Sequence, residues 1–122
     1  MQISQSYQPT FGTKKEFKKL FKVCAYSGEG FEPHDTKTIE HIVPVIRGGD
    51  KYALSNKIVV KRSWNSLRSE MPLGQFMEKY PQIRENIIKT VKGLEGKIID
   101  GINWAEEVKK TFLNEIGFDI FK

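Results

Sequence analysis

Two short β-rich runs followed by a helix-forming segment constrain the fold of this chain more than any other feature of its sequence. The runs cover residues 38–43 and 57–60, and a loop that contains the residues RGGD joins them. Gly48 and Gly49 in this loop permit backbone angles that other residues avoid. Ser63 is predicted to cap a helix that opens at WNSLRS, and Pro72 ends or redirects that helix. The order strand, loop, strand, helix predicts a short two-stranded hairpin packed on helices.

A basic amphipathic helix is predicted before the first run. The segment TKKEFKKLFK offers Thr13 and Glu16 as a capping box. Its apolar residues fall on one helical face, and they are Phe17, Leu20 and Phe21. Its five lysines either lie along phosphates or form a solvated outer face, and the sequence does not choose between these interpretations. The stretch that follows, 23–37, is rich in turn-forming residues and is expected to be irregular or hairpin-like.

Residues 73–122 are expected to be mainly helical and to complete an α+β domain. Helical patterns occupy LGQFMEKY, a segment after Pro81, and NWAEEVKKTFLNEIG. In the last of these, Asn103 and Glu106 form a predicted capping box, and Gly117 is a predicted C-terminal stop. The Ile and Phe residues at helical spacing are interpreted as packing residues.

Length, charge and cysteine content narrow the class of protein. A chain of 122 residues is about the size of one domain, and its net charge of +5 favours an anionic partner. The single Cys24 cannot form an internal disulfide, and the polar N-terminus lacks a signal-peptide pattern, so a cytoplasmic location is expected. No apolar run reaches the roughly 18 residues that a membrane span needs, so no membrane partner is expected.

Four polar residues of the strand and helix segments suggest one reactive site. Glu40 and His41 share the first run, in IEHIVP, while Asn56 opens the second run and Asn65 lies on the predicted helix. A hard cation such as Mg²⁺ prefers oxygen ligands, which Glu40 and the amide of Asn65 would supply. A neutral imidazole at His41 would take a proton from water that attacks phosphorus. This set predicts metal-assisted hydrolysis of a phosphate ester.

These residues resemble the HNH nucleases, which have the ββα-metal fold. The resemblance runs from about residue 24 to residue 72, and its informative part is IEHIVPVIRGGDKYALSNKIVVKRSWNSLRSEMP. Glu40, His41 and Pro44 match the first motif, Asn56 the central Asn, and Asn65 the metal-binding third motif. The resemblance implies one Mg²⁺ or Mn²⁺ ion held by Glu40 and Asn65, with His41 as general base. It also implies that Asn56 braces the loop.

The sequence departs from this family at its zinc-binding positions and at its first motif. Many relatives carry two Cys-x-x-Cys pairs, whereas this chain retains Cys24 but has Ser27, Lys61 and Trp64 at the other positions. Serine, lysine and tryptophan cannot replace thiolates, so a structural zinc ion is not expected. Glu40 stands where Asp or His is commoner, which changes the geometry of the site more than its chemistry. The thin ligand set favours Mg²⁺ or Mn²⁺.

The sequence therefore predicts one domain over 1–122, with an HNH-type core at about 23–72 and a helical extension at about 73–122. Its expected activity is endonuclease cleavage of DNA in a bacterial or phage setting. Four cationic residues near the site are expected to bind nucleic acid, namely Arg47, Lys61, Arg62 and Arg68. Cleavage of RNA or branched DNA is one alternative, and an inactive module that binds nucleic acid or protein is another. A homodimer is also left open, since one site cuts one strand.

Overall fold

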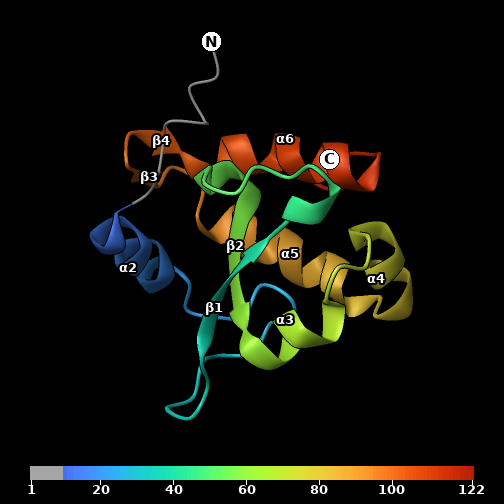
Figure 1. Cartoon of the computed structure of the whole chain (residues 1–122), viewed down its shortest axis with the longest axis horizontal. Helices are drawn as coiled ribbons and strands as arrows, with labels where there is room; N and C mark the ends of the chain where they lie inside the picture. Colours follow the sequence, from blue (N-terminus) through green and yellow to red (C-terminus); the bar gives the residue numbers. More distant parts are fainter. Residues whose placement is uncertain (1–9) are drawn as a thin grey trace.

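The chain is of the mixed α+β class, with helices gathered around two small antiparallel sheets. The computed structural model describes residues 10–122, in which five α-helices accompany the sheets (Figure 1). This confirms the predicted class. Residues 1–9, which carry most of the polar N-terminal stretch, lie outside the described part of the chain.

The predicted strand, strand and helix occur in the expected order. Strand β1 (Lys37–His41) pairs antiparallel with β2 (Lys57–Lys61), and helix α3 (Arg62–Arg68) follows β2 without a connecting loop. The prediction that Ser63 caps this helix is wrong. Lys61 occupies the cap position in an extended conformation and makes no side-chain capping bond, because the strand passes directly into the helix.

The register of the hairpin separates its polar side chains onto two faces. His41 lies directly opposite Lys57, and Glu40 lies opposite Ile58. Because successive side chains of a strand point to opposite faces, His41 and Lys57 share one face while Glu40 is on the other. The face of Glu40 is thereby directed into the protein.

Helix α2 (Phe11–Leu20) packs against the hairpin through its apolar side. Thr10, rather than the predicted Thr13, caps this helix, because its side-chain oxygen accepts a hydrogen bond from the Thr13 amide at 3.1 Å. The predicted helix itself is confirmed, and Phe17 and Phe21 are buried as expected. The following stretch contains an isolated antiparallel bridge between Val23 and Gly30, which agrees with the hairpin-like prediction.

The C-terminal half forms three helices and a second small hairpin. Helices α4 (Leu73–Lys79), α5 (Gln82–Gly93) and α6 (Trp104–Ile116) match the predicted helical segments. Strands β3 (Ile98–Ile99) and β4 (Ile102–Asn103) were not expected from the sequence. None of the helices in residues 10–122 combines the length and apolar character required to cross a membrane.

The ends of α6 agree only in part with the predicted capping. Gly117 follows the helix with φ 97°, a left-handed conformation that glycine adopts without strain, so the predicted stop is confirmed. Asn103 precedes the helix as predicted, but its side chain makes no capping bond. Its buried Oδ1 has no hydrogen-bond partner among the described residues.

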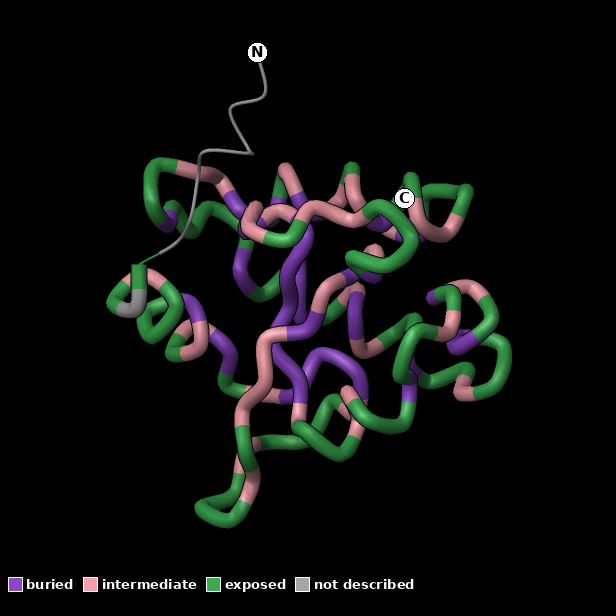
Figure 2. Tube along the Cα trace, in the orientation of Figure 1, coloured by how far each residue is buried: buried purple, intermediate pink, exposed green. Residues whose placement is uncertain are grey.

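Trp104, at the start of α6, joins the N-terminal helix to the hairpin. Its ring packs edge-on against Phe17 and Phe21, with centroids 5.8 and 5.3 Å away. Its indole N–H donates to the carbonyls of Leu54 and Lys57, each at 3.1 Å. Figure 2 shows that the central strand β2 and the segments around it are buried. The hairpin is thus enclosed by helices from both ends of the chain.

Trp104→Phe is expected to lower the free energy of unfolding by about 2 kcal/mol, because it removes the only indole donor to two buried carbonyls and leaves a small cavity. Trp64→Phe provides the matched control. Trp64 is half-buried and its N–H has no partner among residues 10–122. Urea denaturation measures both variants, and equal losses would contradict the role given to the Trp104 N–H.

Candidate functional site

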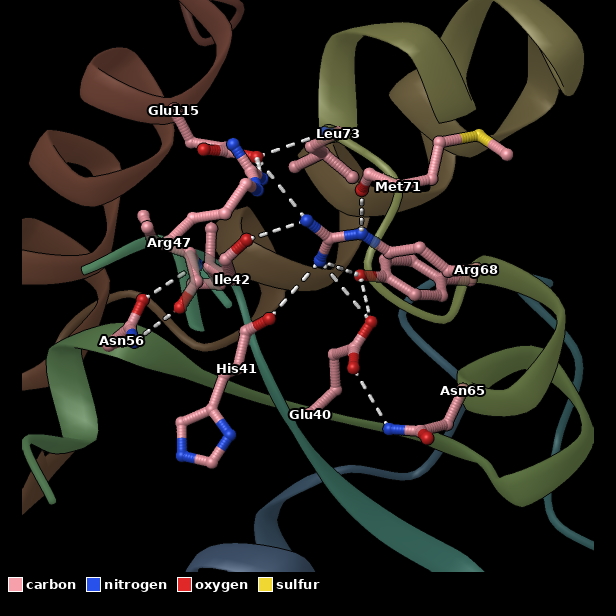
Figure 3. Close-up of polar contacts among 12 residues, drawn as sticks. Glu40, His41, Ile42, Arg47, Asn56, Asn65, Arg68, Met71, Leu73 and Glu115 are labelled. Atoms are coloured by element: carbon pink, nitrogen blue, oxygen red, sulfur yellow. Dashed lines mark hydrogen bonds and ion pairs between the residues drawn. The ribbon is translucent and has the colours of Figure 1, made fainter. Parts of the chain in front are cut away.

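The carboxylate of Glu40 lies inside the protein between β1 and α3 (Figure 3). The residue is only 5% exposed. The Tyr26 hydroxyl donates to its Oε2 at 2.6 Å, and Arg68 Nη1 lies 3.3 Å from the same oxygen. Asn65 Nδ2 donates to the other oxygen, Oε1, at 2.9 Å. A strand directed into the core tolerates this acid because its carboxylate has hydrogen-bond donors on both oxygens.

Burial changes the proton affinity of two members of this cluster. Removal from water raises the pKa of Glu40, while the hydrogen bond from Tyr26 and the positive charge of Arg68 oppose that rise. Burial also raises the pKa of Tyr26 well above its ordinary value, and the neighbouring charge of Glu40 raises it further. Tyr26 therefore keeps its proton at neutral pH and acts as a donor to the carboxylate.

Arg68 does not occupy the surface position expected of a phosphate ligand. It is 1% exposed, and its guanidinium donates to three backbone carbonyls in addition to its contact with Glu40. Those bonds run from Nε to Met71 at 2.9 Å, from Nη1 to His41 at 3.1 Å and from Nη2 to Ile42 at 2.8 Å. The sequence-based prediction of nucleic-acid contact is corrected accordingly, because the donors of Arg68 are used inside the chain.

Glu115 connects this cluster to the C-terminal helix. Its Oε2 lies 2.6 Å from Arg47 Nη2 and 3.3 Å from Arg68 Nη2, and it accepts a hydrogen bond from the Leu73 amide at 3.0 Å. Arg47 remains partly exposed, but one edge of its guanidinium is committed to this ion pair. Neither Glu115 nor Tyr26 was predicted from the sequence, since both occur in segments interpreted as packing or loop.

His41 is oriented by the loop rather than by the carboxylate beside it in sequence. Its Nε2 lies 3.0 Å from the carbonyl oxygen of Lys51. A carbonyl can only accept, so Nε2 carries the hydrogen, and in the neutral ring Nδ1 keeps the lone pair. Figure 3 shows the ring of His41 and the carboxylate of Glu40 on opposite sides of β1, as strand geometry requires.

Asn56 holds the loop between the strands by three hydrogen bonds. Its Oδ1 accepts from the Val43 amide at 2.8 Å, and its Nδ2 donates to the carbonyls of Val43 at 3.0 Å and Asp50 at 2.8 Å. Gly49 allows this close approach, since a Cβ there would lie 1.8 Å from the Val43 oxygen. The preceding Gly48 adopts φ 95°, which glycine tolerates without strain.

Three successive carbonyls of the loop each accept a hydrogen bond from a side chain of the hairpin region. The pairs are Asn56 with Asp50, His41 with Lys51, and Lys57 with Tyr52. The last two donors lie opposite each other in the ladder. The loop position and the orientation of the imidazole are therefore fixed together.

Of the predicted phosphate ligands, only Arg62 is both exposed and outside any ion pair within residues 10–122. Lys61 lies 3.3 Å from carboxylate oxygens of both Glu29 and Asp35. Arg62 lines a polar hollow of about 330 Å³ beside the start of α3, together with His34 and Ser66. The structure thus places Glu40 beside Asn65 and Asn56 against the loop. Of the four cations, it leaves only Arg62 both exposed and outside an ion pair within residues 10–122.

Cys24 and Trp64 are engaged in hydrogen bonds and aromatic packing. Cys24 is buried, and its Sγ accepts from the amides of Ser27 at 3.4 Å and Lys61 at 3.2 Å. Trp64 packs edge-on against Phe76 and Tyr80. Within residues 10–122 no three side chains of His, Cys, Asp or Glu are grouped to hold a metal ion.

Comparison with known proteins finds no similar protein. No protein-family model, curated protein or solved structure matches this chain.

Glu115→Ala is expected to lower the free energy of unfolding by about 3 kcal/mol, because it removes one of the two carboxylates that pair with the buried charge of Arg68. Glu107→Ala, on the same helix, removes an exposed carboxylate paired with Lys110 and should stay within about 0.5 kcal/mol of the parent. Chemical denaturation compares the two variants. Similar losses in both variants would contradict the stabilising role given to the contacts of Glu115.

The buried carboxylate gives stability a pH dependence of defined sign. A carboxyl with a raised folded-state pKa stabilises the fold at low pH and loses that contribution as pH rises through the folded-state value. Glu40→Gln does not titrate, so the variant does not lose this stability as pH rises. The free energy of unfolding of the variant minus that of the parent should therefore increase as pH rises above 4.5, the ordinary pKa of Glu.

Glu95→Gln is the control of opposite sign for this titration. A hydrogen bond from Lys109 lowers the pKa of Glu95, so its contribution is present at neutral pH and lost as pH falls. The same difference, variant minus parent, should decrease as pH rises. Thermal or urea unfolding across the acid range measures both variants, and a flat difference for Glu40→Gln would contradict the burial effect.

Proposed function

We propose that this protein is a metal-dependent endonuclease of the HNH type that hydrolyses phosphodiester bonds in DNA. His41 is the general base, Glu40 and Asn65 hold one Mg²⁺ or Mn²⁺ ion, and Asn56 positions the loop. The observation that carries the proposal is the tethered imidazole, whose Nε2 is held by the Lys51 carbonyl and whose Nδ1 keeps a lone pair.

The orientation of His41 suits it to remove a proton from water. The hydrogen bond at Nε2 selects one tautomer of the neutral ring, and this tautomer presents Nδ1 as the acceptor. Imidazole is the side chain most often used as a general base. As the water oxygen bonds to phosphorus, its proton passes to Nδ1, and the bond from phosphorus to the leaving oxygen breaks with its electron pair going to that oxygen. Because the loop fixes the ring, little motion is lost when substrate binds.

The Glu40 and Asn65 pair supports the assignment of a hard cation. The two side chains come from β1 and α3, and the Asn65 amide nitrogen donates to Glu40 Oε1 at 2.9 Å. Each side chain also carries an oxygen of the type that Mg²⁺ prefers. Oε1 of Glu40 accepts one hydrogen bond from the described residues, whereas a carboxylate oxygen can accept two. A bound ion would stabilise charge on the phosphate and on the leaving oxygen. Arg68 and Tyr26 hold the second oxygen of Glu40 and so fix the direction of the first.

Three further features support the finer assignment to the ββα-metal fold. The hairpin runs directly into α3, the central Asn56 braces the intervening loop, and Cys24 lies against the start of α3 through its bond from the Lys61 amide. Each is the arrangement that the resemblance implies for its residue. RNA or branched DNA would present the same phosphodiester to the site.

One observation favours a second candidate, a module that binds nucleic acid without cleaving it. Arg68 already balances the negative charge of Glu40, and Tyr26 and Asn65 donate hydrogen bonds to its carboxylate. Arg68 would also repel a cation bound there. Such a protein would keep the fold and lose the metal. Affinity for Mn²⁺ separates the two candidates, since the nuclease requires it and the binding module does not.

The first experiment measures conversion of supercoiled plasmid to nicked or linear DNA with Mg²⁺, Mn²⁺ or EDTA. We expect cleavage that depends on metal and falls about 10²- to 10⁴-fold in His41→Ala, the usual contribution of a general base. The chain contains one other histidine, and His34→Ala should cleave like the parent because that side chain is exposed in a loop.

Equal cleavage by the parent and His41→Ala would contradict the assigned base. If the parent cuts neither plasmid, RNA nor junction substrates and binds no Mn²⁺, the binding module becomes the better assignment. The ratio of nicked to linear product reports whether the protein acts on one strand or, as a homodimer, on both.

A further inference from the structure

The positive charge of this protein is concentrated in one short segment that has no assigned role. Residues 11–22 contain five lysines and one glutamate, a net charge of +4 in a chain whose net charge is +5. On helix α2 these lysines recur four residues apart, as Lys14 with Lys18 and Lys15 with Lys19, so their charges lie in rows along the helix. Lys18 is half-buried and the other four are exposed.

These lysines lack the carboxylate partners that five other cations of the chain have. Within residues 10–122 none of the five forms an ion pair, and residues 1–9 contain no acidic side chain. The paired cations elsewhere are Arg47, Lys61, Arg68, Lys109 and Lys110. Uncompensated like charge on one helix is repulsive, and an external polyanion relieves that repulsion.

Helix α2 follows the side of the hairpin that carries His41. At one end, Lys37 Nζ donates to the carbonyls of Lys18 and Phe21 at 3.0 and 2.9 Å. At the other end, Lys57, which lies opposite His41 in the ladder, has a pKa lowered by burial and by the nearby charge of Lys14. Figure 1 shows α2 beside the two strands. The basic rows thus extend along the hairpin toward the imidazole.

We propose that Lys14, Lys15 and Lys19 of α2, together with Lys22 just beyond its C-terminal end, form a binding surface for the sugar-phosphate backbone of DNA and direct the bound strand toward His41. The proposal rests on the proposed function, since the bound strand is the substrate of that site. Backbone contacts of this kind are independent of sequence and weaken with salt, because they release counterions.

A membrane surface is the other polyanion that a basic helix can bind, and the packing of α2 argues against it. Interfacial helices bury an apolar face among lipid chains. Here Phe17 and Phe21 are 0% and 1% exposed and pack against Trp104 in the core. The helix therefore offers charge to a partner and keeps its apolar face for the protein.

The test measures DNA binding in a protein that does not cut. His41→Ala protein in EDTA is titrated with a short labelled DNA duplex by fluorescence anisotropy at several salt concentrations. In this background, the same four exposed lysines, Lys14, Lys15, Lys19 and Lys22, are changed to Gln in one variant, called the α2 variant. Gln keeps helix propensity close to that of Lys. The matched control changes Lys79, Arg84, Lys110 and Lys122 to Gln, which removes the same charge from exposed positions on α4, α5, α6 and the C-terminus.

We expect the slope of log affinity against log salt to decrease in magnitude by about 3 to 4 in the α2 variant and by less than about 1 in the control. Circular dichroism confirms that both remain folded. Equal slopes in the two variants, no measurable binding by the parent, or tighter binding of the parent to anionic vesicles than to DNA would each overturn the proposal. Failure of plasmid cleavage would not, because this assay detects binding without cleavage.

Discussion

The buried guanidinium of Arg68 is the interaction on which the candidate site depends. It contacts two carboxylates, Glu40 at 3.3 Å and Glu115 at 3.3 Å, and it donates to backbone carbonyls at the end of β1. A charge at this depth is tolerated only when its donors are used, and here β1, the loop after α3 and the C-terminal helix all supply acceptors. The group therefore holds the end of β1 against α3 and α6.

Two separate sets of contacts hold the side chains of Glu40 and His41. On the inner face of β1, Arg68 and Tyr26 hold one oxygen of Glu40, and the other oxygen meets Asn65. On the outer face, the loop carbonyl of Lys51 holds the ring of His41, while Asn56 holds the loop itself. Two adjacent residues of one strand thus acquire separate settings, one inside the protein and one beside the loop.

Several parts of the fold were predictable because they depend on local sequence. The apolar periodicity located four helical segments, Gly117 marked the end of α6, and the two β-rich runs located the hairpin. Caps were less predictable, since Thr10 and Thr13 offer the same hydroxyl, and it is Thr10 that has the extended backbone of a cap residue. Arg68 was placed at the surface by its charge, whereas its true position follows from acceptors distant in sequence, among them Glu115.

The sequence by itself determined the α+β class, the order of strands β1 and β2 and of the α-helices, and the set of polar residues at Glu40, His41, Asn56 and Asn65. It did so because hydrophobic period and turn chemistry act over a few residues. Only the tertiary structure decided which of those residues touch, which nitrogen of His41 is free, and which cations face solvent. Those properties depend on contacts between segments tens of residues apart, and no local pattern encodes the partner of a buried charge.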